Sequence, residues 1–288
     1  MNQNLPDRLF VLLLSLLPHH ILSRGMLRLT RCDWAPLKNW AIQRFVRLFH
    51  IDLEQAAEPD PCAYPSINAF FTRALKPGAR PLCGEHLVAA PADGKISAFG
   101  AIDQGRLIQA KGMDFSLSDL VGGDAGIADL FQGGAFATIY LSPRDYHRVH
   151  MPLTGKLRQM IHIPGRLFSV NAATTRTLPR LFTRNERVVN LFDTEVGPMA
   201  VILVGAIFVG CMDTVWAGTV APADLRVNTW RYGQSGQEIK LDKGTEMGRF
   251  NMGSTVILLF GKDALAWDER IKEGLDVRMG EALGGLRQ

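Results

Sequence analysis

The sequence predicts an α+β protein with a body rich in antiparallel β-strands, preceded by amphipathic N-terminal helices. After residue 87, short β-branched and apolar runs alternate with Gly, Pro and Asp turns, as is typical of antiparallel sheets. The first 50 residues combine a nine-residue apolar run with seven basic residues against two acidic ones. Because the whole chain carries a formal charge of only +4, the remaining residues sum to −1. The basic charge therefore belongs to the N-terminal segment.

Residues 9–17 (LFVLLLSLL) predict the first helix. Nine helical residues are about 14 Å long, about half of a bilayer core, so this run is too short to span a membrane. A cleaved signal peptide is disfavoured because Asp7 offsets Arg8, and because HHILSRG follows where a small-residue cleavage site would be needed.

A second helix is predicted over residues 34–48, where apolar residues recur at helical spacing beside two arginines. The apolar stripe consists of Trp34, Leu37, Ala41, Phe45 and Leu48, and the arginines are Arg44 and Arg47. This mixture suits a helix at a lipid headgroup boundary, and the alternative is an ordinary helix packed on the protein's own core. With the run at 9–17, it predicts that residues 1–50 are a membrane-associating helical segment.

Residues 52–66 contain three prolines and are predicted to be a linker. Ser66 is the expected N-cap of a short helix whose apolar spacing continues to Leu75 before Pro77-Gly78 stops it. Residues 51–288 show no internal repeat and are predicted to form one domain.

The body is predicted to contain eight strands and two short helices. The strands are residues 95–99, 106–110, 136–141, 156–163, 187–192, 200–209, 214–219 and 255–260. The helices are residues 114–120 and 171–178.

Several classes of protein are disfavoured by missing motifs. The four cysteines are widely spaced without a C-x-x-C, which argues against a disulfide framework or zinc knuckle and for a reducing compartment. Gly205 and Gly210 have the spacing of a phosphate-binding loop, but Cys211-Met212 follows in place of Lys-Ser/Thr. The charge and aromatic patterns of a nucleic-acid module are absent, so no nucleic-acid partner is expected.

Three short stretches are dense in residue types that carry out catalysis. They are the turn Pro91-Ala92-Asp93-Gly94, residues 141–150 with His147 and His150, and residues 246–260 with Gly253-Ser254-Thr255. Taken singly, each has an ordinary structural explanation. The histidine pair leaves open a metal site or two solvated histidines; no third ligand of recognisable spacing follows, and no metal is predicted.

Together the stretches permit a Ser-His-Asp constellation, because such triads are recognised by geometry and not by chain order. One outcome is a serine hydrolase. The other follows from Gly253, whose missing side chain leaves its carbonyl open to attack by the Ser254 hydroxyl. An N→O acyl shift followed by elimination would split the chain, and the dehydroalanine formed from Ser254 would hydrolyse to a pyruvoyl group.

The sequence resembles the phosphatidylserine decarboxylase family, closely in its bacterial form. The motifs that carry the resemblance are FFTRxLKPGARP at 70–81, PADG at 91–94, LSPRDYHRVHMP at 141–152, PGxLFSVN at 164–171, NER at 185–187, GPM at 197–199, VWAG at 215–218, EMGRF at 246–250 and GST at 253–255. The resemblance runs from about residue 66 to about residue 261. Met252 stands where the family usually has Leu, a change of similar volume.

The resemblance implies a carboxy-lyase that converts phosphatidylserine to phosphatidylethanolamine and CO₂ through a Schiff base with a pyruvoyl group. It implies self-cleavage between Gly253 and Ser254 into a β chain (residues 1–253) and an α chain (residues 254–288). Pyruvate made from Ser254 would be the cofactor and would act as the electron sink. The α chain has only 35 residues, so we expect it to stay packed in the sheet that residues 255–260 enter.

The resemblance also assigns roles in self-cleavage. Ser254 is the nucleophile, His150 the base and Asp93 the carboxylate that orients His150, while Asp145 assists Asp93 or shares its role. For decarboxylation, it assigns proton donation to His147, whose ordinary pKa near 6.5 would suit a general acid.

Substrate contacts are expected from Phe168, Ser169 and Asn171, with Ser169 the first candidate; an ordinary strand-end turn is the alternative. Expected partners are phosphatidylserine and an anionic membrane, to which each basic residue contributes about 1 kcal/mol of attraction.

The implied location is peripheral, on the cytoplasmic face of the cell membrane. The resemblance further implies an α/β heterodimer from one precursor and a dimer of such units. A lipid-directed serine hydrolase and a non-catalytic membrane scaffold stay open as alternatives.

Overall fold

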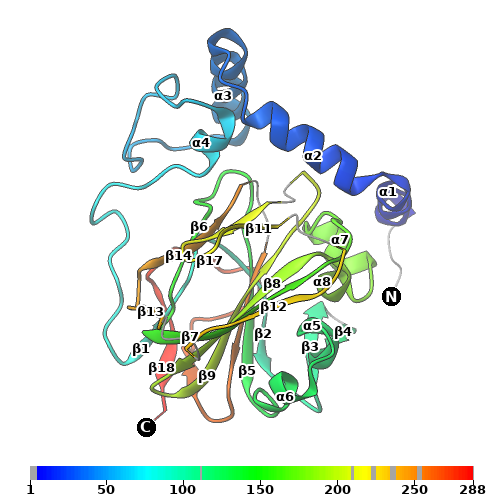
Figure 1. The fold of residues 1–288 in the computed structure, drawn as a ribbon, viewed down its shortest axis with the longest axis vertical. Coiled ribbons are helices and arrows are strands. Elements are labelled where there is room, and N and C mark those ends of the chain that lie inside the picture. The colour runs from blue at the N-terminus through cyan, green and yellow to red at the C-terminus, as the bar shows by residue number, and fades with distance from the viewer. Residues whose placement is uncertain are drawn as a thin grey trace.

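The computed structural model describes residues 5–110, 112–208, 211–221, 225–233, 238–251 and 255–287. The predicted cleavage site at Gly253 and Ser254 lies outside these residues. The predicted fold class is confirmed in its coarse form: antiparallel sheets make up the body, and three helices precede it. Figure 1 shows these helices at the end of the molecule opposite the C-terminus.

The N-terminal helices are α1 (Leu5–Leu16), α2 (His19–Thr30) and α3 (Ala35–Phe49). The helices expected at 9–17 and 34–48 are confirmed, whereas α2 has no apolar run and was not predicted. Pro18 separates α1 from α2, because proline disfavours the helical conformation in the residue before it. No single helix in the described ranges is long and apolar enough to cross a membrane, but α1 and α2, bent by 81°, pass that test as a pair on length and composition.

Many apolar side chains of these helices face away from the protein. Nine of them are 55–78% exposed: Leu5, Leu9, Leu12, Leu13, Leu16, Ile21, Trp34, Trp40 and Leu48. The stripe predicted on α3 is divided, because Phe45 packs inward beside the fully buried Ile42. The core-packing interpretation of residues 34–48 is therefore confirmed for part of the helix, and the headgroup-boundary interpretation stays a prediction for the exposed part.

The short helix α4 (Ile67–Phe71) begins as predicted, with the Ser66 side chain accepting the Ala69 N–H. It ends before Leu75, which instead forms an antiparallel bridge with Ala56 in the linker.

The main sheet has nine strands, and its paired neighbours are all antiparallel. Their order is β12 (Asn228–Arg231), β7 (Gly155–Ile163), β8 (Arg187–Thr194), β9 (Gly197–Val204), β15 (Thr255–Phe260), β5 (Ala135–Tyr140), β2 (Gly94–Ala101) and β17 (Asp276–Val277), with β13 (Lys240–Leu241) also paired to β7. Every residue of β15 is buried, so this apolar strand forms the centre of the core.

Three smaller sheets complete the body. The first consists of β11 (Gly218–Ala221), β10 (Met212–Thr214), β14 (Glu246–Phe250) and β6 (Arg148–His150), in that order. The second consists of β1 (Leu87–Ala89), β18 (Ala282–Leu286) and β16 (Leu265–Trp267). The third is the hairpin of β3 (Arg106–Ala110) with β4 (Met113–Ser116). The short helices are α5 (Leu117–Leu120), α6 (Ala125–Asp129), α7 (Ala172–Thr177) and α8 (Leu181–Arg184).

Besides α4, three predicted elements differ from the structure. The strand expected at 214–219 is a turn between β10 and β11, because Gly218 adopts a positive φ of 64° and the Thr214 hydroxyl accepts the Ala217 N–H. The helix expected at 114–120 is confined to α5, since Ser116 caps it and the residues before pair with β3. The strand expected at 200–209 ends at Val204. The other predicted strands and the helix at 171–178 are confirmed, with small shifts at their ends.

Candidate active site

The site lies at one end of the strands of the main sheet, here called the sheet edge, where β2 and β15 both begin. Thr255 pairs with Tyr140 of β5, and Tyr140 pairs with Lys95 of β2. At a strand spacing of about 4.8 Å, β2 and β15 start about 10 Å apart. Asp93 directly precedes β2. Gly94 follows it because a Cβ there would lie 2.5 Å from the Tyr140 carbonyl oxygen.

Asp93 is held by a buried bidentate ion pair with Arg80. The guanidinium donates from Nε to Oδ1 at 2.9 Å and from Nη2 to Oδ2 at 2.5 Å, and the Met279 N–H also donates to Oδ1. Such a fork-to-fork pair fixes the carboxylate in one orientation. The hydrogen bond to His150 that an orienting role would require is not among those found in the described residues.

His150 is instead oriented by backbone groups and a tyrosine. The backbone N–H of His150 donates to the Pro91 carbonyl at 2.8 Å, which places His150 beside the turn that contains Asp93. Its Nδ1 lies 2.8 Å from the Gly244 carbonyl oxygen and its Nε2 lies 3.0 Å from the Tyr146 hydroxyl. Since a carbonyl only accepts, Nδ1 carries the proton and Nε2 is the basic atom.

The electrostatics of His150 favour the neutral ring. Burial lowers its pKa below the ordinary value, and the Gly244 carbonyl, Glu246 and Asp93 oppose that shift. Asp93 thus acts on His150 through its charge, while Gly244 supplies the orienting contact predicted for Asp93. At neutral pH, the imidazole is therefore available as a base.

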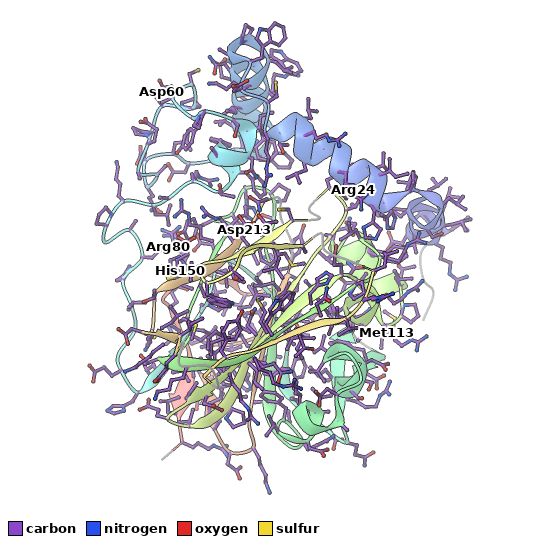
Figure 2. The ribbon with its side chains drawn as sticks, viewed as in Figure 1. Arg24, Asp60, Arg80, Met113, His150 and Asp213 are labelled. Atoms are coloured by element: carbon purple, nitrogen blue, oxygen red, sulfur yellow. The ribbon has the colours of Figure 1, made fainter. Side chains whose placement is uncertain are left out.

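Two partners in this cluster were not predicted, Arg80 and Tyr146. Burial raises the pKa of Tyr146 well above its usual value, so its hydroxyl keeps its proton and donates to His150. Both residues lie inside the motifs quoted for the family, and Arg80 precedes Asp93 by 13 residues. No local spacing signals a pairing over that distance. Figure 2 labels Arg80 and His150 close together on the body.

His147 lies in a drier environment than the sequence suggested. It has no exposed surface, its ring stacks on Phe71 at 4.0 Å, and neither ring nitrogen has a hydrogen-bond partner among the described residues. Burial, reinforced by Arg73, lowers its pKa to about 3, while the nearby backbone carbonyls of Pro143 and Ser142, which make no well-formed hydrogen bond to the ring, act in the opposite direction. This corrects the expectation of an ordinary pKa: His147 is neutral at cellular pH, and any proton it gives comes from a neutral N–H.

The burial of His147 predicts a loss of stability in acid. Between about pH 6.5 and pH 3 the unfolded chain binds a proton on His147 that the folded chain excludes. The free energy of unfolding therefore falls with decreasing pH, by up to about 1.4 kcal/mol per unit in that window. Urea denaturation at a series of pH values measures this slope. His147→Gln should make it shallower, and an unchanged slope would contradict the assignment.

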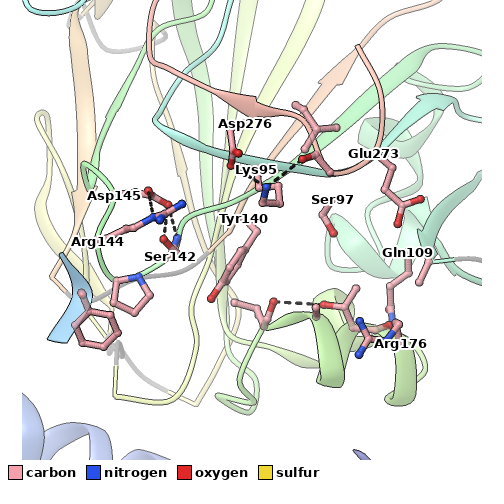
Figure 3. A pocket seen from close by; sticks show the side chains of 18 of the residues that line it. Lys95, Ser97, Gln109, Tyr140, Ser142, Arg144, Asp145, Arg176, Glu273 and Asp276 are labelled. Atoms are coloured by element: carbon pink, nitrogen blue, oxygen red, sulfur yellow. Dashed lines mark hydrogen bonds and ion pairs between the residues drawn. The ribbon is translucent and has the colours of Figure 1, made fainter. Parts of the chain in front are cut away.

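Asp145 holds the turn before His147 and does not pair with His150. Its Oδ2 accepts from both the backbone N–H and the hydroxyl of Ser142, each at 2.7 Å. Burial raises its pKa above the usual range. Figure 3 shows this turn on one side of Tyr140, with Gln109 and Arg176 on the other.

Two apolar cavities meet at Tyr140. The sheet-edge cavity of Figure 3, about 590 Å³, extends over β2, α7 and the end of α3. The helix-side cavity, about 410 Å³, lies between the body and the side chains of Phe10, Leu14 and Phe45 from α1 and α3. Both are also lined by Phe49, Pro143 and Val170. Together they can take an elongated apolar ligand whose polar end lies near the start of β15.

The fold gives the three predicted substrate contacts two different surroundings. Ser169 and Asn171 line the helix-side cavity. The Asn171 side chain is also the N-cap of α7, accepting the Thr174 N–H at 3.0 Å. Phe168 is 1% exposed and lies between Arg166, Arg184 and the edge of His19, so its side chain holds the loop in place. Substrate contact by all three residues stays a prediction.

Buried acid–base groups beside an apolar cavity are typical of an enzyme that acts on an amphipathic substrate. The family model described as phosphatidylserine decarboxylase matches residues 67–285, and a second model, described as PSD, matches residues 9–50. The chain belongs to the phosphatidylserine decarboxylase family.

Curated relatives agree with the family model. A protein of Azotobacter vinelandii is 55% identical over 280 residues, which cover 96% of this chain and 98% of that one. A protein of Bordetella pertussis is 57% identical over 279 residues, covering 96% and 94%. A protein of Pseudomonas aeruginosa is 54% identical over 286 residues, covering 98% of each chain. All three are named phosphatidylserine decarboxylase proenzyme.

Proposed function

We propose that this chain is the proenzyme of a carboxy-lyase that converts phosphatidylserine to phosphatidylethanolamine and CO₂. The observation that carries the proposal is the position of β15. The strand that follows Ser254 begins beside Tyr140, which lines both apolar cavities. A phospholipid would place its acyl chains in these cavities and its serine headgroup at the sheet edge.

Self-cleavage between Gly253 and Ser254 would yield residues 1–253 and 254–288. We assign His150 the role of base, acting through Nε2, because its Nδ1 proton is directed to Gly244. The negative charge of the Asp93 carboxylate, which Arg80 holds in one orientation, stabilises the proton that His150 takes up. Tyr146 occupies Nε2 in this structure, so it must yield that contact to the serine hydroxyl.

The described residues fit a pyruvoyl group made from Ser254. Among the described residues, Thr255 Oγ1 is buried without a hydrogen-bond partner, as is the ring of His147. The His147 carbonyl accepts the Phe250 N–H, four residues before Ser254. These two side chains would hold the group. When present, the pyruvoyl carbonyl supplies the electron sink that decarboxylation of an amino acid requires.

We assign His147 proton transfer during decarboxylation. Loss of CO₂ leaves an electron pair on the substrate's α carbon, which must gain a proton in place of the carboxylate. A neutral imidazole can give its N–H proton as its other nitrogen takes one up from water that enters with the substrate, so that the ring stays uncharged in its dry site. The stack on Phe71 keeps the ring plane fixed for that transfer.

The proposal is tested by assay and mass measurement on the purified protein. Release of CO₂ from carboxyl-labelled phosphatidylserine, with a small fragment that begins with pyruvate and lacks an α-amine, is expected. A single uncut chain that hydrolyses lipid would replace this function by a serine hydrolase. A chain that neither decarboxylates phosphatidylserine nor hydrolyses lipid would favour the alternative of a non-catalytic membrane scaffold.

We also propose that α1–α3 attach the enzyme peripherally to the cytoplasmic face of an anionic membrane. The exposed apolar side chains of α1 support this, as do the basic residues of the first 50 positions. A dimer of α/β units is proposed on family resemblance alone.

Replacing exposed leucines of α1 is expected to release the protein from lipid. Leu9, Leu13 and Leu16 lie on one helix face and are 55%, 57% and 74% exposed. Each side chain is worth about 1.5–3 kcal/mol when buried, so the triple change to Ser should weaken vesicle partitioning by about 100-fold or more. Sedimentation with phosphatidylserine-containing vesicles measures this. Ile108→Ser, at a body position 54% exposed, is the matched control, and equal sedimentation of both variants would reject α1 as the anchor.

A further inference from the structure

The junction between α1 and α2 is bonded directly to the loop of residues 164–171, here called the site loop. His19, at the start of α2, is 2% exposed and uses both ring nitrogens. Its Nε2 lies 2.7 Å from the Leu14 carbonyl oxygen in α1, and its Nδ1 lies 3.3 Å from the Leu167 backbone nitrogen. The partners fix the tautomer: Nε2 donates to the carbonyl, and Nδ1 accepts the N–H.

The same loop is also held by Asn185. Its Oδ1 accepts the Phe168 N–H at 3.1 Å, and its Nδ2 donates to the carbonyl oxygens of Phe168 and Gly205, each at 2.9 Å. Asn185 is fully buried at the end of α8. His19 and Asn185 thus hold consecutive backbone groups of the loop immediately before Ser169, which lines the helix-side cavity.

Further contacts lie along the same junction. His20 Nε2 donates to the Gly165 carbonyl at 2.9 Å, and Arg166 donates to the Ser15 carbonyl at 2.7 Å. The Ser23 hydroxyl accepts the Phe208 N–H at 3.1 Å. Phe208 also lines the helix-side cavity. Two loops that border the cavity are therefore bonded to α1 and α2, which lie across this end of the body in Figure 1.

A helix that served only as an anchor would not need these contacts. An anchor requires exposed apolar surface, whereas His19 is buried and directs its acceptor at a loop 148 residues away in the sequence. A buried polar side chain is favourable only when its partners are present, so the contact specifies where the loop lies.

We propose that His19 is a positioning residue for decarboxylation, which fixes the site loop against the α1–α2 junction so that the N-terminal helices complete the active site. The inference rests on the proposed function. It goes beyond that function in giving the helices a part in turnover, separate from membrane attachment. A loop displaced by about 1 Å commonly costs about 100-fold in rate.

Three variants of His19 separate its two contacts. His19→Asn places an amide oxygen near the position of Nδ1 and keeps an acceptor for the Leu167 N–H. His19→Gln places an amide nitrogen near the position of Nε2 and keeps only the donor to Leu14. His19→Leu removes both. If the role is to position the loop, kcat should decrease from wild type through His19→Asn and His19→Gln to His19→Leu. The kcat of His19→Leu should be lower than that of wild type by about 10-fold or more.

The assay uses short-chain phosphatidylserine dissolved as monomers, so that membrane attachment does not enter the rate. Vesicle sedimentation and the extent of chain cleavage are measured on the same preparations. Expected results are unchanged sedimentation, complete cleavage, a lowered kcat for Gln and Leu, and recovery in Asn. Equal kcat in all variants, or Gln equal to or better than Asn, would overturn the proposal. The proposal would also be overturned if the variants lost activity only toward phosphatidylserine in vesicles and not toward the monomeric substrate, because His19 would then serve membrane anchoring.

Failure of the proposed function is distinguishable from failure of this inference. If wild-type protein releases no CO₂, the proposed function fails. If wild-type protein is active and the order among the His19 variants is not found, only the positioning role fails.

Discussion

Replacing Ser254 with alanine is expected to leave one uncut chain without decarboxylase activity. The effect should be complete, because the proposal makes Ser254 both the nucleophile for cleavage and the residue that becomes the pyruvoyl group. Without its hydroxyl, no acyl shift can begin, and no electron sink is available to a bound amino acid. Denaturing electrophoresis with intact-mass measurement shows the cleavage state, and CO₂ release shows the activity.

A buried hydroxyl elsewhere in the sheet provides the control for this change. Thr138 lies on β5, next to β15, and its hydroxyl has no hydrogen-bond partner in the part of the chain that the structure describes. Thr138→Val should therefore be cleaved and active like wild type, since it removes a buried polar atom without changing the shape. Cleavage that persists in Ser254→Ala would show that another residue is the nucleophile.

The strands that the sequence predicted best are those with the strongest local signal. β15 and β3 occupy the predicted residues, because each is an apolar or β-branched run between clear turns. β6, β14 and the three C-terminal strands were missed. Their two to five residues carry little periodicity, and β17, with two residues, exists only through its pairing with β2. Such strands depend on partners far away in the sequence.

The candidate site shows the same contrast between what local sequence motifs predict and what depends on distant segments of the chain. The motifs predicted that Asp93 and His150 belong together, and the fold places them side by side through the Pro91 carbonyl. Their partners could not be predicted, because Arg80 and Gly244 reach the site through tertiary packing. The pKa of His147 was also beyond sequence reasoning, since its value near 3 is set by burial against Phe71.

His150→Gln and His147→Gln are expected to block different steps. Glutamine cannot take up the serine proton, so His150→Gln should slow chain cleavage by about 10²–10⁴-fold. His147→Gln should still cleave but lose decarboxylation by a similar factor. Cleavage is followed on a gel over time after synthesis, and CO₂ release is measured on the cleaved fraction. Two uncut variants, or two cleaved and active ones, would contradict the division of roles.

The hydrogen bonds of the two rings explain this division. His150 is bonded at both nitrogens, which fixes one tautomer and leaves Nε2 as a base once Tyr146 moves aside. Among the described residues, His147 has no hydrogen bond at either nitrogen, and its side chain has no exposed surface, an arrangement that is unfavourable unless a polar group approaches it. Under the proposed roles, a bound substrate headgroup would supply such a group. The ring that is already satisfied would then serve the chain's own cleavage, and the unsatisfied ring would serve the substrate that arrives later.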